Sequence, residues 1–142
     1  MSGAPFVLDS TLAADGHFVG DLPLSTVLLM DDARFPWLIV VPRVAGMRDL
    51  IDLRRAQRQA LLDEVDACAY ALRALHAPLK LNVAALGNVV AQLHVHVIAR
   101  HAGDAAWPKP VWGVGDREHY ASVALTAEVA RLRVALGLAN AQ

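Results

Sequence analysis

A short segment of the chain, residues 92–98, alternates polar and apolar side chains with a period of two: its sequence is Gln-Leu-His-Val-His-Val-Ile. Because successive side chains of a β-strand point to opposite faces of a sheet, this alternation predicts a strand with one apolar face. The other face carries Gln92, His94 and His96. Side chains two residues apart lie about 6.6 Å apart along a strand, so both imidazoles can contact one substrate group.

The composition favours one small protein domain, spanning residues 1–142, because 56% of the residues are hydrophobic. A net charge of −1 gives no overall field that would attract a nucleic acid polymer. Cys68 is the only cysteine, and the sequence contains neither a secretory signal nor an apolar run of membrane-spanning length. We therefore expect a cytoplasmic protein with a small-molecule ligand and no membrane partner.

The first part of the chain predicts strands at residues 17–20, 26–30 and 37–41, where apolar and β-branched side chains lie between turn residues. Residues 52–76 predict a helix with Asp52 as its cap, because apolar side chains recur at intervals of three and four. This apolar stripe consists of Leu61, Val65, Cys68, Leu72 and Leu75.

The second part predicts strands at residues 80–85 and 89–99, joined by a turn at residues 87–88. A last helix is expected after Asp116, which is placed to cap it. Its buried stripe consists of Leu125, Val129, Leu132 and Leu136. Strands, helix, strands and helix in this order indicate an α+β domain with a mostly antiparallel sheet.

Residues 92–98 resemble the motif of the histidine-triad (HIT) family, His-φ-His-φ-His-φ-φ, in which φ is apolar. Six of the seven positions match, and Gln92 replaces the first histidine. The resemblance extends over roughly residues 27–113 in the order of the elements. It implies a fold of about five antiparallel strands with two main helices, a two-fold dimer, and a nucleotide hydrolase or nucleotidyl transferase that needs no cofactor or metal.

The resemblance also implies roles for individual residues. His94 aligns with the nucleophile that attacks the α-phosphate and becomes transiently nucleotidylated, as expected for a dinucleoside polyphosphate or nucleoside phosphoramidate substrate. His96 aligns with the histidine that contacts the phosphate, and Gln92 with the one that helps to shape the pocket. A tryptophan in the C-terminal segment lines the partner subunit's site in some relatives, which is a role open to Trp107 or Trp112.

Three further residues fall near positions that bind the nucleotide in the family. The acidic side chain for the ribose is matched by Asp31, and the contacts to phosphate oxygens or the leaving group are matched by Asn82 and Asn88. All three are also common turn residues that hydrogen-bond to their own backbone. Both interpretations stay open from the sequence alone.

These residue types suit a nucleophilic attack on a phosphate group. Unperturbed histidine has a pKa near 6.5, so a neutral imidazole is available as a nucleophile at pH 7, provided that its other N–H donates to an acceptor such as a backbone carbonyl. We expect a protonated His96 to stabilise the charge that spreads over the phosphate oxygens. Gln92 cannot act as an acid or base, although its amide can still donate and accept hydrogen bonds.

Two other functions fit the same motif. A His-x-His strand can present two imidazoles to a metal ion, with His101 or Asp104 as a third ligand. Alternatively, the replacement at Gln92 can leave a nucleotide-binding module without turnover.

Overall fold

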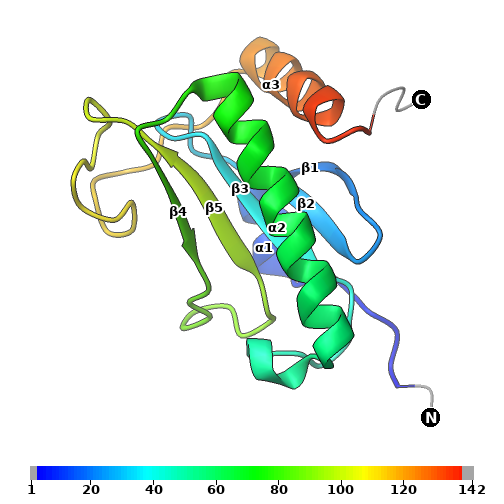
Figure 1. The fold of residues 1–142 in the computed structure, drawn as a ribbon. Helices are drawn as coiled ribbons and strands as arrows, with labels where there is room; N and C mark the ends of the chain where they lie inside the picture. The colour runs from blue at the N-terminus through cyan, green and yellow to red at the C-terminus, as the bar shows by residue number, and fades with distance from the viewer. Residues whose placement is uncertain (1–2, 139–142) are drawn as a thin grey trace.

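Five strands form one antiparallel sheet in the order β1-β2-β3-β5-β4 (Figure 1). The structure is a computed structural model that describes residues 3–138. The strands are β1 (Gly16–Asp21), β2 (Ser25–Met30), β3 (Trp37–Pro42), β4 (Lys80–Ala84) and β5 (Val95–Arg100). The predicted α+β fold with five antiparallel strands is therefore confirmed.

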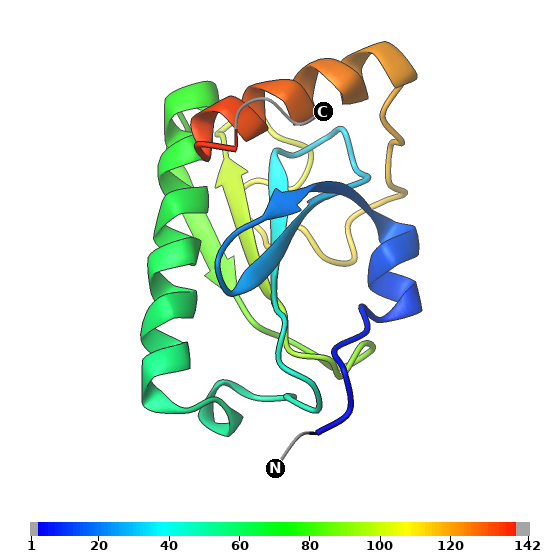
Figure 2. The ribbon, with the colours of Figure 1, turned by 90° about the vertical axis from the view of Figure 1, so that its right-hand side faces the viewer.

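Helices cover both faces of this sheet. The helices are α1 (Ser10–Asp15), a 3₁₀ turn η1 (Leu50–Asp52), α2 (Arg55–His76) and α3 (Ser122–Ala135). Figure 2 shows α2 along one face of the sheet and α1 on the opposite side, with α3 across one end. The two main helices of the prediction are α2 and α3, and α1 is an additional short helix before the first predicted strand.

The alternation of residues 93–98, which leads into β5, divides their apolar side chains between two hydrophobic clusters. Leu93, Val95 and Val97 belong to the larger cluster, which also contains the buried stripe of α2. Ile98 points to the opposite face and belongs to a second cluster with Phe35 and other apolar side chains. His94 and His96 lie on this second face, as the period of two predicts.

Helix α2 has the predicted stripe: Leu61, Val65, Cys68 and Leu72 are buried, and Leu75 packs against them. It begins later than predicted, because residues 50–52 form η1 instead. The prediction that Asp52 caps α2 is therefore wrong. Its carboxylate accepts hydrogen bonds from the backbone N–H groups of Arg48 and Asp49, which closes the preceding turn.

The predicted strand at residues 89–99 is shorter in the structure, since β5 begins only at Val95. Residues 85–94 form a loop, in which Gly87 has a positive φ of 76°. The backbone N–H of Leu93 donates to the carbonyl of Met47 and so pairs with the segment before η1 rather than with β4. This loop brings His94 to the end of the sheet.

The stripe of α3 is confirmed: Leu132 is fully buried, while Leu125, Val129 and Leu136 pack against the larger cluster. The prediction that Asp116 caps this helix is wrong, because α3 begins at Ser122 after Ala121. The intervening residues hydrogen-bond to the β2–β3 connector instead. Within residues 3–138, none of the helices combines the length and the apolar content that a membrane crossing needs.

Arg100, at the end of β5, is a fully buried cation. Its guanidinium forms two hydrogen bonds to the carboxylate of Asp104, at 2.8 and 3.0 Å, and one to Asn82 at 2.9 Å. Asp104 also accepts hydrogen bonds from the backbone N–H groups of residues 101, 106 and 107. The ion pair therefore fixes the start of the long segment that follows β5.

We predict that Arg100→Met lowers the free energy of unfolding by about 3–5 kcal/mol, because it leaves the Asp104 carboxylate buried without its cation. Urea denaturation measures this change. Arg117→Met is the matched control, since the Arg117–Asp15 pair is about one third exposed and its removal costs less than about 1 kcal/mol. An equal loss of unfolding free energy in both variants would contradict the stabilising role of the Arg100–Asp104 pair.

Candidate active site

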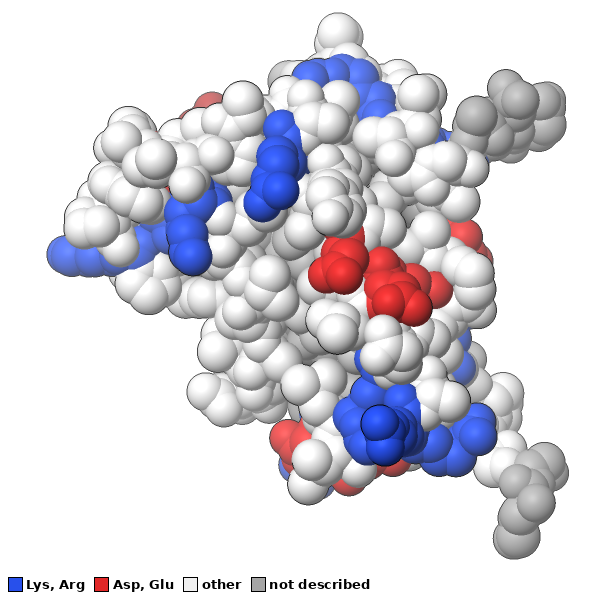
Figure 3. Space-filling view, viewed as in Figure 1, with Lys and Arg blue, Asp and Glu red and all other residues white. Residues whose placement is uncertain are grey.

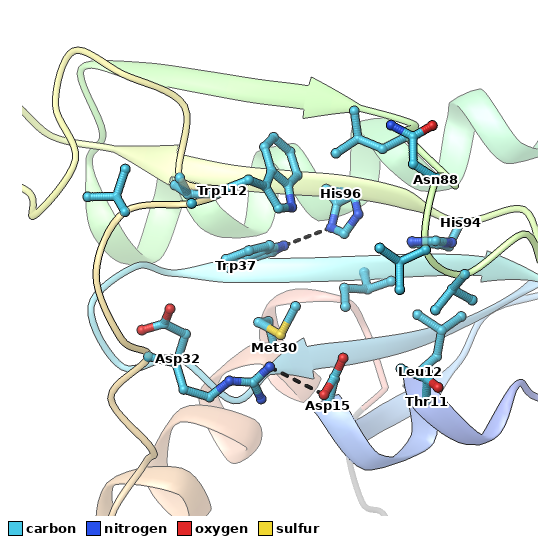
Figure 4. Close-up of a pocket in the computed structure, with 18 of the residues that line it drawn as sticks. Thr11, Leu12, Asp15, Met30, Asp32, Trp37, Asn88, His94, His96 and Trp112 are labelled. Atoms are coloured by element: carbon cyan, nitrogen blue, oxygen red, sulfur yellow. Dashed lines mark hydrogen bonds and ion pairs between the residues drawn. The ribbon is translucent and has the colours of Figure 1, made fainter.

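His94 and His96 line the same cavity, which has a volume of about 530 Å³ and lies on the sheet face opposite α2. Its walls come from α1, from β2 and β3, and from two loops, residues 86–90 and 111–117. Figure 4 shows Met30, Asp15, Leu12 and Thr11 across the cavity from Asn88 and the two histidines. A cavity of this size is typical of small-molecule sites.

The orientation of His94 is fixed by its own chain. Nδ1 lies 2.7 Å from the backbone carbonyl oxygen of Gln92. A carbonyl only accepts, so Nδ1 carries the proton, and in the neutral ring Nε2 then carries the lone pair. Among the described residues, no hydrogen bond engages Nε2. The structure thus has the backbone acceptor that the sequence analysis expected for a nucleophilic histidine, and it leaves the reactive nitrogen free.

His96 is buried, with only 4% of its surface exposed. Burial lowers the pKa of His96 to about 4, and repulsion from a charged neighbouring His94 lowers it in the same direction. His96 is therefore neutral at pH 7. The sequence gives no measure of how deeply this side of the strand is covered and so does not indicate a neutral His96 in the free protein; a protonated His96 beside a bound phosphate stays a prediction.

Two tryptophans enclose His96. The indole Nε1–H of Trp37 donates to Nδ1 of His96 at 2.9 Å, as drawn in Figure 4. The ring of Trp112 lies edge-on to His96, with the ring centroids 5.0 Å apart. His94 packs against the imidazole from the remaining side, at 4.9 Å between centroids. Trp112 therefore lines a cavity of its own chain, whereas Trp107 contacts Arg100 instead.

Asp32, and not the predicted Asp31, lies at the polar end of the cavity. Asp32 lines the cavity and pairs with Arg34 at 2.8 Å. Arg34 also donates to the carbonyl of Val114 at 2.6 Å, which holds the loop at residues 111–117 against the connector. Residues 28, 30 and 32 share one face of β2 and its extension, so the period of two indicates that Asp32 lies on the cavity face.

Asp31 faces away from the cavity and joins three segments. Its carboxylate accepts hydrogen bonds from His119 at 2.5 Å and from the backbone N–H of Tyr120 at 3.0 Å, and it lies 3.1 Å from Nε2 of His17. Burial alone would raise the pKa of Asp31, but these interactions lower it to about 2. In this structure Asp31 fastens the end of β2 to the segment before α3.

The two asparagines have different positions. Asn88 lines the cavity beside the histidines (Figure 4). Asn82 lies opposite Ile98 in β4, beyond the cavity, and its side-chain oxygen accepts a hydrogen bond from Arg100. The structure therefore brings Asn88 together with His94 and His96, and it places Asn82 outside this group.

Gln92 also lies outside the main cavity. Its side-chain oxygen accepts from the backbone N–H of Asp9 at 2.9 Å, and its amide donates to the carbonyl of Val7 at 2.8 Å. Asp9 in turn caps α1, whose residues Thr11 and Leu12 line the cavity. The side chain at the first motif position thus anchors the wall formed by α1, while its backbone carbonyl orients the neighbouring histidine.

The two additional metal ligands considered from the sequence are engaged elsewhere. Nε2 of His101 hydrogen-bonds to the carbonyl of His76 at 2.8 Å. Asp104 binds Arg100 and three backbone N–H groups. Among residues 3–138, no cluster of three or more His, Cys, Asp or Glu side chains is arranged to hold a metal ion.

Comparison with protein families places this geometry in context. The HIT domain model matches residues 11–103, and the chain belongs to the HIT family. The segment that it covers runs from α1 through the histidine strand to the start of the Asp104 turn. A comparison with curated proteins gave no match.

Solved structures agree with this assignment. A histidine triad protein from Bradyrhizobium japonicum is 44% identical, with a TM-score of 0.92 over 94% of this chain and 99% of that chain. One from Marinobacter aquaeolei is also 44% identical, with a TM-score of 0.92 over 94% and 98%. A hypothetical histidine triad nucleotide-binding protein from Sulfolobus tokodaii is 14% identical and shares the fold, with a TM-score of 0.67 over 89% of each chain.

We predict that Gln92→Ala makes the backbone amide of Asp9 exchange its hydrogen faster, by roughly five- to thirtyfold, because that N–H loses its acceptor. Hydrogen exchange followed by NMR measures this rate residue by residue. Gln59→Ala is the control, since Gln59 is an exposed residue of α2 whose side chain donates to Asp63 within the same helix. An unchanged Asp9 rate in the Gln92 variant would contradict the anchoring role.

Proposed function

We propose that this protein is a nucleotide hydrolase or nucleotidyl transferase that uses His94 as its nucleophile. One observation carries the proposal: the His94 ring donates its Nδ1–H to the Gln92 carbonyl and keeps a free Nε2 at the wall of the cavity. Membership of the HIT family supports an activity on nucleotides, and the Sulfolobus tokodaii relative is described as nucleotide-binding.

The reaction follows from this orientation in two displacements. Nε2 attacks the α-phosphorus, a P–Nε2 bond forms, and the bond to the leaving group breaks with its electron pair going to that group. A water oxygen, or the hydroxyl of another acceptor in a transferase, then attacks the same phosphorus, its proton passes to solvent, and the electron pair of the P–Nε2 bond returns to His94. The hydrogen bond from Nδ1–H to the Gln92 carbonyl is kept throughout, so the ring does not have to reorient.

The surroundings of His94 support a substrate with a group on each side of the phosphorus. Besides the main cavity, His94 borders a second hollow of about 330 Å³, which is lined by Arg48, Leu50 and Ile51 among others. We propose that the larger cavity takes the nucleoside monophosphate portion and the second hollow takes the leaving group. This arrangement suits a dinucleoside polyphosphate or a nucleoside phosphoramidate.

We predict a covalent nucleotide adduct on His94. Wild-type protein mixed with a panel of these substrates and quenched without acid should gain the mass of one nucleoside monophosphate in intact-protein mass spectrometry, on the peptide that contains residues 92–98. His94→Ala should show no adduct and should lower kcat by at least roughly a thousandfold, because the group that forms the bond is gone.

His119→Ala is the matched control, since His119 is 71% exposed and lies outside the cavity. It should form the adduct as the wild type does. Nucleotide binding without an adduct or turnover in the wild type would favour the binding module over the enzyme. Turnover that survives the loss of His94 would contradict the mechanism.

We also propose that the protein is a homodimer in the cytoplasm. β4 is an edge strand with an unpaired side in this chain, and such edges are commonly covered by a second copy. Leu79, Val83 and Leu86, in and around β4, are about one half to two thirds exposed. On the face in Figure 3, much of the surface over β4 is uncharged.

We predict that Val83→Lys raises the dimer dissociation constant by roughly tenfold or more, because the interface would bury an unpaired ammonium group. Light scattering during size-exclusion chromatography over a range of concentrations measures the mass. Val123→Lys on the exposed face of α3 is the control. A wild-type monomer at every concentration would contradict the dimer.

A further inference from the structure

The hydrogen bond between Trp37 and His96 determines where the imidazole proton lies. The indole N–H of Trp37 is only a donor, so the Nδ1 atom that receives it at 2.9 Å must carry a lone pair. Both side chains are about 95% buried, and a buried indole N–H needs a partner. In a neutral imidazole with a lone pair on Nδ1, the proton is on Nε2.

We propose that Trp37 is a positioning residue, which holds His96 with its proton on Nε2 so that Nε2–H donates to a phosphate oxygen of the substrate attacked by His94. The substrate in this statement rests on the proposed function. The tautomer of His96 does not, because it follows from the contact between two side chains of the free protein.

The packing around His96 leaves the ring little freedom to turn. Trp112 and His94 press on it edge-on, with interplanar angles of 79° and 74°. Trp37 itself makes an edge contact with the imidazole, at 5.6 Å between centroids, and with Trp112 at 5.7 Å. A rotation of the imidazole by 180° would separate the indole N–H from its acceptor.

The charged groups around the cavity do not determine the tautomer of His96. Those that line the cavity are paired with one another: Arg34 with Asp32 at 2.8 Å, and Arg117 with Asp15 at 3.3 Å. His94 is the titratable group in contact with the His96 ring. Among the described residues no carboxylate hydrogen-bonds to His96, so the indole is the group that selects its tautomer.

The tautomer matters because phosphate oxygens only accept hydrogen bonds. A neutral imidazole with its proton on Nδ1 would present a lone pair to the oxygen, and the two would repel each other. Trp37 converts a neutral ring into a fixed donor where negative charge develops. This explains how a histidine that is uncharged at pH 7 can still stabilise a phosphate group.

Nitrogen NMR tests the tautomer directly in the substrate-free protein. In the wild type, Nδ1 of His96 should have the chemical shift of an unprotonated nitrogen at pH 7, with a scalar coupling to Nε1 of Trp37 across the hydrogen bond. Trp37→Phe, which keeps an aromatic ring but removes the donor, should abolish the coupling. A protonated Nδ1 in the wild type would overturn the inference whether or not the protein is an enzyme.

Binding of AMP at several pH values tests the role of the donor without requiring turnover. Trp37→Phe should weaken binding about fivefold at pH 8, and this loss should shrink as the pH falls to about 4, the pKa of His96, because an imidazolium has an N–H on Nε2 whichever tautomer it came from. Trp107→Phe, outside the cavity, should bind AMP as the wild type does at every pH. A loss in Trp37→Phe that is the same at all pH values indicates packing alone and overturns the donor role.

An absence of AMP binding by the wild type would overturn the donor role and would count against the proposed function as well. The NMR result would still stand by itself, so the two failures are distinguishable. A wild type with the expected tautomer and AMP affinity, but no adduct on His94, would contradict the proposed mechanism and leave the inference intact.

Discussion

The structure depends on the alternation of side chains along β5. This strand lies between β3 and β4, and each of its residues must serve either the core beneath α2 or the cavity on the other face. A shift of the pairing by one residue would move Val95 and Val97 to the cavity and bury both histidines under α2. Because that exchange would place polar rings in an apolar core, the hydrophobic effect that stabilises the sheet also orients the site.

Much of the polar chemistry near the cavity holds backbone in place. Arg34 fixes the loop of residues 111–117, Gln92 fixes the segment before α1, and Arg100 fixes the chain after β5. Each of these side chains bonds to a segment that is distant in sequence or irregular in structure. The cavity is thus formed by loops that have few backbone partners of their own, and side chains from the sheet and its connectors supply the missing hydrogen bonds.

The sequence predicted the features that repeat along the chain and missed those that depend on distant contacts. The period of two located His94 and His96, and the spacing of three and four located the stripes of α2 and α3. Nothing local indicates that Gln92 bonds to residues more than 80 positions earlier, or that Trp37 donates to His96 on the neighbouring strand, 59 positions later. The positions of Asp31 and Asp32 are different in this respect, because extending the alternation of β2 places Asp32, and not Asp31, on the cavity face.

The burial of His96 also has a thermodynamic consequence. The pKa of its side chain is lowered to about 4 in the folded protein, whereas an unfolded histidine has a pKa near 6.5. Between these values the unfolded chain binds a proton at this position that the folded chain does not bind, so this residue makes the protein less stable as the pH falls through that interval. Folding thus favours the neutral imidazole, and the indole of Trp37 then decides which of its two nitrogens faces the cavity as a donor.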